Sequence, residues 1–305
     1  MSSWRIVFLG TPDFAVESLK ALLQAGYNVV GVVTAPDKPA GRGQKLSESA
    51  VKQYAQEQGL PILQPIKLKD PEFIAQLSAL KPDLQVVVAF RMLPETVWNL
   101  PPQGTVNVHG SLLSNYRGAA PINWAILNGE KETGVSTFKL QHEIDTGDIL
   151  LQEKMPIGPN ETAGELHDRM KVEGAQLLVK TLQELANGTL KASQQQLNSD
   201  IKHAPKLFKT DCEIDWNNTS EQIHNQIRGL SPYPTAFTVL GDKTLKIFSA
   251  EIEPGKPEIP AGTFSSDHKS YLKFAATDGY LSLKEMQLEG KKKMGIEEFL
   301  RGIRL

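Results

Sequence analysis

The sequence predicts an α/β domain with a parallel β-sheet, followed by a small antiparallel β-barrel. The chain has 305 residues, more than a single hydrophobic core usually contains. In the first half, short β-branched runs alternate with helical stretches, as in sheets built from crossover units. In the second half, short runs of alternating polarity are separated by Gly and Asp turn residues, as in small antiparallel barrels.

The parallel sheet is expected from four runs that are apolar at nearly every position, which is typical of strands covered on both faces. These runs are residues 5–9, 28–34, 84–90 and 105–108. Apolar residues at spacings of three and four predict crossover helices at residues 14–25, 48–58 and 72–80. A longer helix is expected at 163–186, where Thr162 and Glu165 have the spacing of a capping box.

A polar segment that is poor in large apolar residues separates the two halves. We therefore expect an α/β domain at residues 1–188, a linker at 189–205 and the barrel domain at 206–305. The strands of the barrel are expected at residues 236–240, 244–251, 271–276 and 280–288.

Composition excludes several classes of protein. With 40% hydrophobic and 22% charged residues the chain is expected to be globular. A net charge of −2 excludes nucleic-acid binding by bulk positive charge, so such binding must use a local patch. The single cysteine, Cys212, excludes an intramolecular disulfide. We expect no signal peptide, and the longest apolar runs, such as 86–90, are too short to span a bilayer. A soluble, cytoplasmic protein is expected.

The segment from Asn107 to Pro121 carries the most informative polar residues. Because side chains alternate along a strand, Asn107 and His109 are expected on one face of it. The carboxyl end of a parallel strand is where open α/β sheets bind ligands. The alternative is that Asn107 caps a turn and His109 is a buried histidine with satisfied hydrogen bonds.

A second polar motif is Asp145-Thr-Gly-Asp148, which follows an apolar run at 135–140. Ordinary turn chemistry explains such residues. A carboxylate beside His109 would instead fix the tautomer of the imidazole. Sequence spacing alone leaves both interpretations open.

Basic side chains concentrate at two places: Lys38, Arg42 and Lys45 in an early loop, and Lys291, Lys292 and Lys293 near the C-terminus. Either group is also compatible with a solvated surface. The remaining histidines lack metal-ligand spacing, and no Gly-x-Ser-x-Gly elbow or dinucleotide fingerprint is present. We therefore expect no metal and no serine nucleophile.

Motifs along nearly the whole chain are similar to those of the methionyl-tRNA formyltransferase family. Its opening motifs resemble Gly10-Thr-Pro-Asp-Phe-Ala15 and Pro36-Asp-Lys-Pro-Ala-Gly-Arg-Gly43. Its core resembles Asn107-Val-His-Gly-Ser-Leu-Leu113, Tyr116-Arg-Gly-Ala-Ala-Pro121 and Asp145-Thr-Gly-Asp148. The C-terminal motifs are Ala204-Pro-Lys206, Ile214-Asp-Trp216, Ile227-Arg228, Ser231-Pro-Tyr-Pro234 and Glu298-Phe-Leu-Arg-Gly302. All folate-dependent formyltransferases share the core, whereas the 36–43 loop and the C-terminal motifs make the resemblance specific.

The resemblance implies a Rossmann-like catalytic domain joined to an oligonucleotide-binding-type β-barrel that binds tRNA. It implies transfer of a formyl group from 10-formyltetrahydrofolate to the methionyl amine of initiator tRNA, by a monomer, with Asn107, His109 and Asp145 as the catalytic residues. By resemblance the folate pocket is lined by Phe90, Arg91, Met92, Leu93, Ser111, Leu112, Leu113 and Ser114. The chain departs from the family at Ser114, where a proline is usual, and at Phe90-Arg91, where an aromatic-glycine pair is common.

The residue types suit this chemistry. Asn107 can donate an amide N–H to the formyl oxygen as charge develops there, and protonated His109 can offer a second donor. Asp145 would orient His109 and could accept the proton of the amine, directly or through water. Lys38, Arg42 and Lys45 could reach the acceptor stem, and Lys291, Lys292 and Lys293 could hold the tRNA backbone.

Two other kinds of function remain as alternatives. One is a related enzyme, either a formyltransferase that acts on an amino sugar nucleotide or a folate hydrolase with the same core. The basic 36–43 loop argues against both of these enzymes, because neither of them has to bind the acceptor stem of a tRNA. The other is a non-catalytic RNA-binding protein, which is disfavoured because residues 206–305 contain equal numbers of basic and acidic residues.

Overall fold

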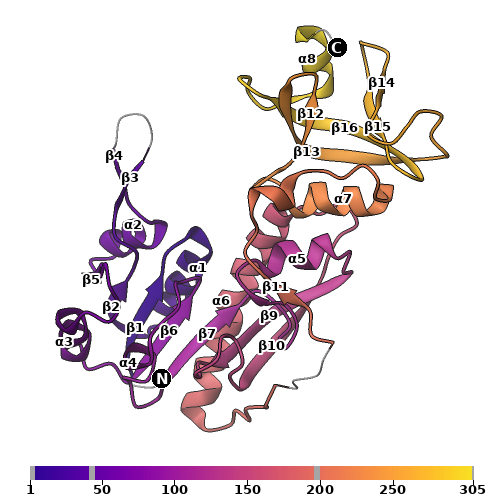
Figure 1. The fold of residues 1–305 in the computed structure, drawn as a ribbon. Coiled ribbons are helices and arrows are strands. Elements are labelled where there is room, and N and C mark those ends of the chain that lie inside the picture. Colours follow the sequence, from indigo (N-terminus) through magenta and orange to yellow (C-terminus); the bar gives the residue numbers. More distant parts are fainter. Residues whose placement is uncertain (1–3, 41–44, 196–199, 304–305) are drawn as a thin grey trace. The chain divides into compact units, whose positions relative to one another are not determined.

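The computed structural model describes residues 4–40, 45–195 and 200–303 (Figure 1). Their contacts divide them into two compact units. The first lies within Met1–Arg117, Gly134–Met155 and His167–Lys202, and the second within Gly118–Thr133, Pro156–Leu166 and His203–Leu305. Each unit therefore combines stretches that are far apart in the sequence.

The first unit is built on a seven-stranded sheet in the order β10-β9-β7-β6-β1-β2-β5. Its strands are β1 (Arg5–Gly10), β2 (Asn28–Val33), β5 (Ile62–Leu63), β6 (Leu84–Val88), β7 (Thr105–His109), β9 (Glu132–Lys139) and β10 (Ile149–Pro156). The strands from β7 to β5 pair in parallel, and β9 joins β7 antiparallel. The predicted Rossmann-like sheet is confirmed, and β1, β2, β6 and β7 occupy the four predicted runs.

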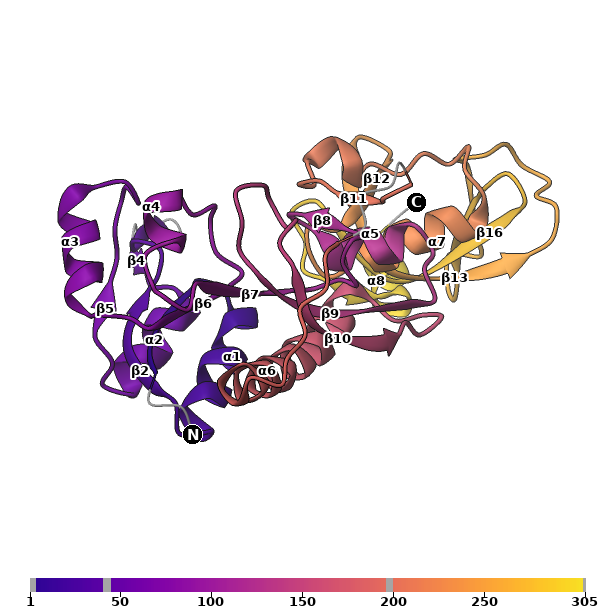
Figure 2. The ribbon, with the colours of Figure 1, turned by 90° about the horizontal axis from the view of Figure 1, so that it is seen from below.

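The helices of this fold are α1 (Asp13–Gln24), α2 (Ala50–Glu57), α3 (Pro71–Ala79), α4 (Glu95–Trp98) and α6 (Ala163–Asn187). The predicted capping box of α6 is confirmed, because Thr162 N donates to Glu165 Oε2 at 2.8 Å and Glu165 N to Thr162 Oγ1 at 3.2 Å. Figures 1 and 2 both show α6 beside α1, and an ion pair of 2.7 Å between Lys171 Nζ and Asp13 Oδ2 joins them. None of the helices in the described stretches is both long and apolar enough to cross a bilayer.

A β-hairpin occupies part of the early basic loop. β3 (Lys38–Ala40) pairs antiparallel with β4 (Lys45–Ser47). The hydroxyls of Thr34 and Ser49, on either side of the hairpin, lie 2.7 Å apart. The sequence did not predict these strands, because each has only three residues and β3 contains Pro39.

The second unit contains a curled antiparallel sheet in the order β12-β13-β16-β15-β14, with β17 paired to β16. The strands are β12 (Ala236–Leu240), β13 (Lys243–Pro254), β14 (Phe264–Ser266), β15 (Leu272–Ala275), β16 (Gly279–Leu288) and β17 (Met294–Gly295). The four predicted strands correspond to β12, β13, β15 and β16. The antiparallel β domain is thus confirmed as a half-barrel, with β12 and β14 at the two ends of the strand order.

Helices α5 (Pro121–Leu127), α7 (Ser220–Gly229) and α8 (Ile296–Gly302), with the 3-10 helix η1 (Lys209–Cys212), complete the second unit. Trp216 stacks on Phe274 in its core, with ring centroids 4.7 Å apart. Asn123 Nδ2 on α5 donates to the carbonyl of Gly229 at the end of α7, at 2.8 Å. Two further strands, β8 (Arg117–Gly118) and β11 (His203–Ala204), are two residues long.

The described residues 189–195 of the expected linker belong to the first unit. Ser193 exchanges main-chain hydrogen bonds with Ile149 at 2.8 and 2.9 Å, next to the start of β10. Gln195 is 9% exposed. This segment is therefore anchored at the edge of the sheet.

Candidate active site

Strand β7 carries Asn107 and His109 two residues apart, so both lie on the same face of the strand. β7 lies between β6 and β9, and Asn107 is in register with Phe138 of β9. His109 is only 7% exposed, whereas Asn107 is partly exposed. An amide and an imidazole are therefore held together at the carboxyl end of a central strand.

The two ring nitrogens of His109 face different protein groups. Nε2 lies 2.8 Å from the main-chain carbonyl oxygen of Tyr116. A carbonyl only accepts hydrogen bonds, so Nε2 carries a proton. Nδ1 faces Asp145, with 3.9 Å between Nδ1 and Oδ2. For His109 to donate to a substrate oxygen, one of these contacts must be exchanged for the substrate.

Asp145 lies in the connection between β9 and β10. Its side chain is 12% exposed, and its backbone adopts φ +53°, in the left-handed region that Asp tolerates better than most residues. The turn is tight, because a Cβ at Gly147 would overlap the carbonyl oxygen of Lys139. The backbone N–H of Lys139 donates to the carbonyl of Asp148 at 3.2 Å and closes the connection. The Asp-Thr-Gly motif therefore forms a turn and also presents a carboxylate to His109.

The sequence analysis proposed Asp145 as a catalytic residue and did not include two residues that contact its turn. Gln195 Nε2 donates to the carbonyl oxygens of Asp145 and Gly147, both at 2.8 Å. Arg117 donates to Gln195 Oε1 from Nε at 3.1 Å and from Nη2 at 2.5 Å. Gln195 was hidden in a polar run that resembles a linker, and Arg117 in a motif whose role was taken from resemblance alone.

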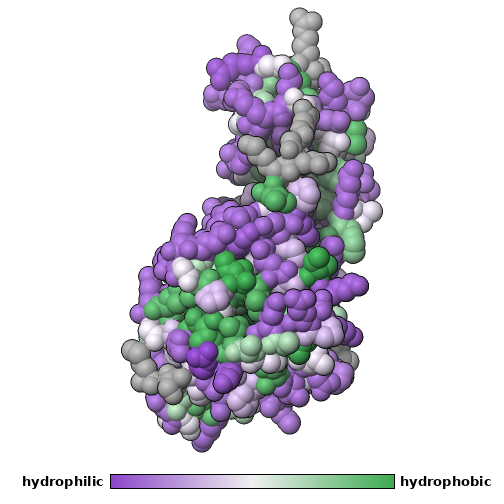
Figure 3. Space-filling model, turned by 90° about the vertical axis from the view of Figure 1, so that its left-hand side faces the viewer, coloured by the Kyte–Doolittle hydropathy of each residue, from purple (hydrophilic) through white to green (hydrophobic). Residues whose placement is uncertain are grey.

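The residues expected around folate have different exposures. Phe90 and Leu93 pack against the apolar cluster beneath β1 and β6, whereas Arg91 and Met92 are exposed. Arg91 donates to the main-chain carbonyls of Pro65 and Ile66, at 2.8 Å for Ile66. Figure 3, which views the side of the molecule that carries α2, α3 and β5 in Figure 1, shows a gathering of apolar side chains bordered by hydrophilic ones.

Among the expected folate residues that follow β7, Ser111 and Leu113 make hydrogen bonds and packing contacts within the protein. Ser111 Oγ donates to the carbonyl of Asn115 at 2.7 Å, and Ser111 is fully buried. Leu113 packs with Phe138 and Ile149, and its N–H donates to Ser136 Oγ at 3.0 Å. Leu112 and Ser114 are partly exposed.

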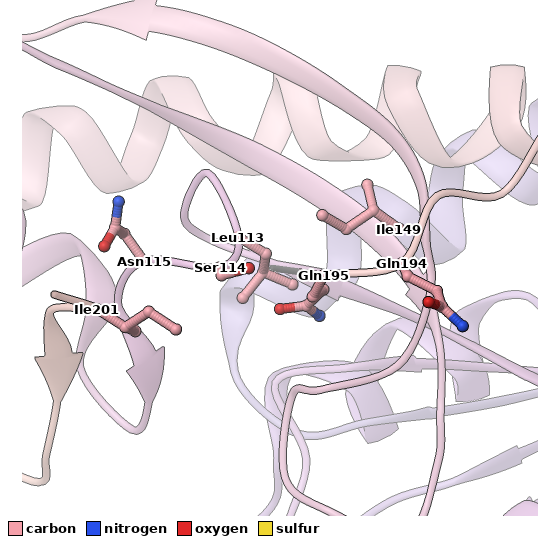
Figure 4. A pocket seen from close by; sticks show the side chains of 7 residues that line it. All are labelled: Leu113, Ser114, Asn115, Ile149, Gln194, Gln195 and Ile201. Carbon is pink, nitrogen blue, oxygen red and sulfur yellow. The ribbon is translucent and has the colours of Figure 1, made fainter. Parts of the chain in front are cut away.

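A pocket of about 280 Å³ opens beside this loop (Figure 4). It is lined by Leu113, Ser114, Asn115, Ile149, Gln194, Gln195 and Ile201. In Figure 4, Asn115 and Ile201 lie toward one end of the pocket, and Ile149 and Gln194 toward the other. The loop after β7 and the anchored 189–195 segment therefore share a cavity.

The early hairpin has a network of charges at its base. Lys52 pairs with Asp37 and, at 2.7 Å, with Glu48. Gln64 Nε2 also donates to Asp37 at 2.8 Å. Hydrogen bonds from Lys52 and Gln64 lower the pKa of Asp37, and the two carboxylates raise the pKa of Lys52. The charge of Lys52 balances one of the two carboxylates, and these contacts hold the start of the hairpin to α2.

The expected tRNA contacts are placed as follows. Lys38 begins β3, Lys45 begins β4, and Arg42 lies outside the described residues. Lys291, Lys292 and Lys293 are all exposed in the second unit. Lys292 pairs with Glu298 at 3.0 Å, and Lys293 with Glu285 at 2.7 Å, so part of that positive charge is balanced locally.

Among the described residues, no group of three or more His, Cys, Asp or Glu side chains could hold a metal ion. The site itself brings together an amide, an imidazole and a carboxylate, from Asn107, His109 and Asp145. Such a set can stabilise charge on an acyl oxygen and move a proton.

The candidate site lies on a Rossmann-like sheet, and comparison with known families shows the class of enzyme that is built on it. A formyl transferase model matches residues 4–182, and a model of the formyl transferase C-terminal domain matches residues 206–304. The chain belongs to the formyl transferase family and is a formyl-transferring enzyme.

Its relatives over the full length carry a more specific name. The methionyl-tRNA formyltransferase of Parabacteroides distasonis is 53% identical over 310 residues, covering 98% of this chain and 96% of the relative. That of Flavobacterium johnsoniae is 50% identical over 307 residues, covering 99% and 97%. The resemblance inferred from the sequence motifs is thereby confirmed.

Solved structures share the fold at lower identity. The N-formyltransferase of Helicobacter canadensis, in complex with folinic acid and dTDP-3-aminofucose, has a TM-score of 0.68 at 22% identity, covering 95% of this chain and 100% of that chain. HypX of Aquifex aeolicus, in complex with tetrahydrofolic acid, has a TM-score of 0.67 at 18% identity, covering 99% of this chain and 48% of that chain.

Proposed function

We propose that this protein transfers the formyl group of 10-formyltetrahydrofolate to the amino group of methionyl initiator tRNA, for translation initiation. The observation that carries the proposal is that Asp145 Oδ2 lies 3.9 Å from His109 Nδ1 in a chain half identical, along its whole length, to methionyl-tRNA formyltransferases. The folate donor is also supported by the fold neighbours, which were solved with folinic acid and tetrahydrofolic acid.

In this reaction the amine nitrogen forms a bond to the formyl carbon, and the bond from that carbon to N10 of the folate breaks. One proton leaves the amine and one ends on N10. Asn107 donates to the formyl oxygen, where negative charge develops. His109 supplies a second donor after exchanging one of its protein contacts, and Asp145 orients the ring and accepts the proton of the amine, directly or through water.

We assign folate binding to the loops after β6 and β7. The residues are Phe90, Arg91, Met92, Leu93, Ser111, Leu112, Leu113 and Ser114. Of these, Arg91 and Met92 are accessible to a ligand, and Phe90 and Leu93 form a partly buried apolar base. Ser111 and Leu113 would act by shaping the loop, because both are buried.

We assign tRNA contacts to the early basic loop and to the C-terminal lysines. Lys38, Arg42 and Lys45 would guide the acceptor stem, and Lys291, Lys292 and Lys293 would hold the tRNA backbone. Residues 1–188 would carry the chemistry and residues 206–305 would bind tRNA, in a monomer. A net charge of −2 means that these local groups must supply the attraction to phosphate.

An amino sugar nucleotide is the main competing acceptor, since the Helicobacter canadensis enzyme was solved with one. That enzyme is 22% identical to the chain, against 53% for the full-length relative from Parabacteroides distasonis. The deciding experiment offers the purified protein 10-formyltetrahydrofolate with either charged initiator tRNA or a dTDP-amino sugar. Formylation of the tRNA alone supports the proposal, and formylation of the sugar alone contradicts it.

A further inference from the structure

The side chain of Gln195 ties the Asp145 turn to the segment that follows His109. Its Nε2 donates to the carbonyl oxygens of Asp145 and Gly147 at 2.8 Å each. Its Oε1 accepts from the guanidinium of Arg117. All the hydrogen-bonding atoms of this amide are therefore engaged, on a side chain that is 9% exposed.

The chemistry of the partners fixes which way the amide points. A guanidinium has only donors, so it must face the amide oxygen. A main-chain carbonyl only accepts, so the two carbonyls must face the amide nitrogen. No other side chain of the same length supplies both an acceptor for Arg117 and two donors for the turn.

These contacts close a ring around the catalytic pair. His109 donates to the carbonyl of Tyr116, Arg117 is the next residue along the chain, and Gln195 connects Arg117 to the backbone of Asp145. Asp145 then faces His109 from the other side, at 3.9 Å. Asp145 has a left-handed backbone, and the amide of Gln195 donates directly to the carbonyl of that residue.

We propose that Gln195 is a positioning residue, which holds the Asp145 carboxylate opposite Nδ1 of His109. The proposal rests on the formyl transfer proposed above. It gives residues 189–195, which the sequence analysis expected to belong to a linker, a part in the chemistry. The ligand-facing groups remain those of Asn107, His109 and Asp145.

The decisive variant is Gln195→Glu. It keeps the size of the side chain and an acceptor for Arg117, but it cannot donate to the two carbonyls. Gln194→Glu is the matched control, because it adds the same charge one residue away on an exposed side chain that points in a different direction (Figure 4). Gln195→Met removes the hydrogen bonds without adding charge, and separates loss of donors from gain of charge.

Steady-state formylation of charged initiator tRNA gives the readout. Gln195→Glu and Gln195→Met are expected to lower kcat by about 10- to 100-fold, since misplacing a catalytic group by about 1 Å can cost a hundredfold. KM for 10-formyltetrahydrofolate and for tRNA is expected to stay within about twofold, and Gln194→Glu to behave as wild type. This split between kcat and KM would not follow from a general loss of structure.

A double variant tests whether Gln195 lowers kcat by its contact with Asp145 when it is replaced. In an Asp145→Asn background, Gln195→Met is expected to lower kcat by less than about twofold further, because the group that it positions is already disabled. Full additivity of the two effects would contradict the proposal.

The remaining outcomes are also decisive. Failure of the wild-type protein to formylate tRNA would refute the proposed function itself. An active wild type with Gln195→Glu and Gln195→Met as fast as Gln194→Glu would refute only the role of Gln195. Loss of the cooperative thermal transition in both Gln195 variants would also count against it, by showing that the side chain serves folding.

Discussion

His109 donates from Nε2 to the main-chain carbonyl of Tyr116 at 2.8 Å, seven residues further along the chain. This contact requires a proton on Nε2 and turns Nδ1 toward Asp145. The carboxylate therefore faces the ring nitrogen opposite the one that is bonded to the main chain. The loop between β7 and α5 therefore orients the imidazole of His109.

Replacing Asn107 by Ala should lower single-turnover formylation by about 10²–10³-fold, the usual effect of losing one donor to a developing oxyanion. Folate and tRNA affinities should change little, because the donor acts mainly in the transition state. Rapid-quench kinetics with charged initiator tRNA measure the rate. Asn99→Ala, on an exposed residue after α4, is the control, and equal rates for the two variants would remove Asn107 from the mechanism.

Replacing Lys38 or Arg42 by Ala should weaken tRNA binding and leave folate binding intact. Each lost phosphate contact should reduce the slope of log affinity against log salt by about one. Filter binding over a range of salt concentrations gives that slope, with Lys20→Ala on α1 as the control. An equal loss of folate affinity would place the early basic loop at the donor site instead.

Replacing Lys52 by Met should loosen the base of the hairpin. The ammonium group holds Asp37 and Glu48, and without it the two carboxylates repel each other. We expect tRNA affinity to fall roughly fivefold, or about 1 kcal/mol, and protease cleavage between residues 36 and 47 to become faster. Unchanged cleavage and affinity would show that the hairpin is held by its main chain alone.

The stability of the second unit should depend on pH through His224. Burial, and then the nearby Arg228, lower the pKa of His224 from its ordinary value of 6.5. The unfolded chain therefore binds a proton that the folded chain does not, so stability falls as the pH drops below about 6.5. Thermal unfolding at pH 7.5 and pH 5.5 should show this loss, and His224→Gln should reduce it. An identical pH dependence in the variant would be evidence against this cause.

The sequence predicted those strands and helices whose buried positions form a regular pattern of apolar residues along the chain. Strands β1, β2, β6 and β7 are apolar on both faces and were located within a residue or two at most ends. Helix α7 was missed because its composition is polar, although Thr219 and Gln222 form a capping box that would have marked its start. The β3–β4 hairpin was missed because it is short and contains a proline.

The sequence indicated which residues could form the candidate site. It did not indicate how residues from distant segments come together in space. Alternation along β7 placed Asn107 and His109 together, since strand geometry is local. The approach of Asp145 depends on β9 and β10 packing at the edge of the sheet, which spacing does not encode. Gln195 is 50 residues from Asp145 in the sequence, and its role follows only from hydrogen bonds formed in the folded chain.

The most direct test of the account is the single-turnover formylation rate of Asp145→Asn, which keeps the shape of the side chain but removes its charge. If the carboxylate acts with His109 as described, the rate should fall at least about a hundredfold, with tRNA and folate binding and the thermal transition close to those of wild type. A variant that formylates initiator tRNA at nearly the wild-type rate would contradict the central claim.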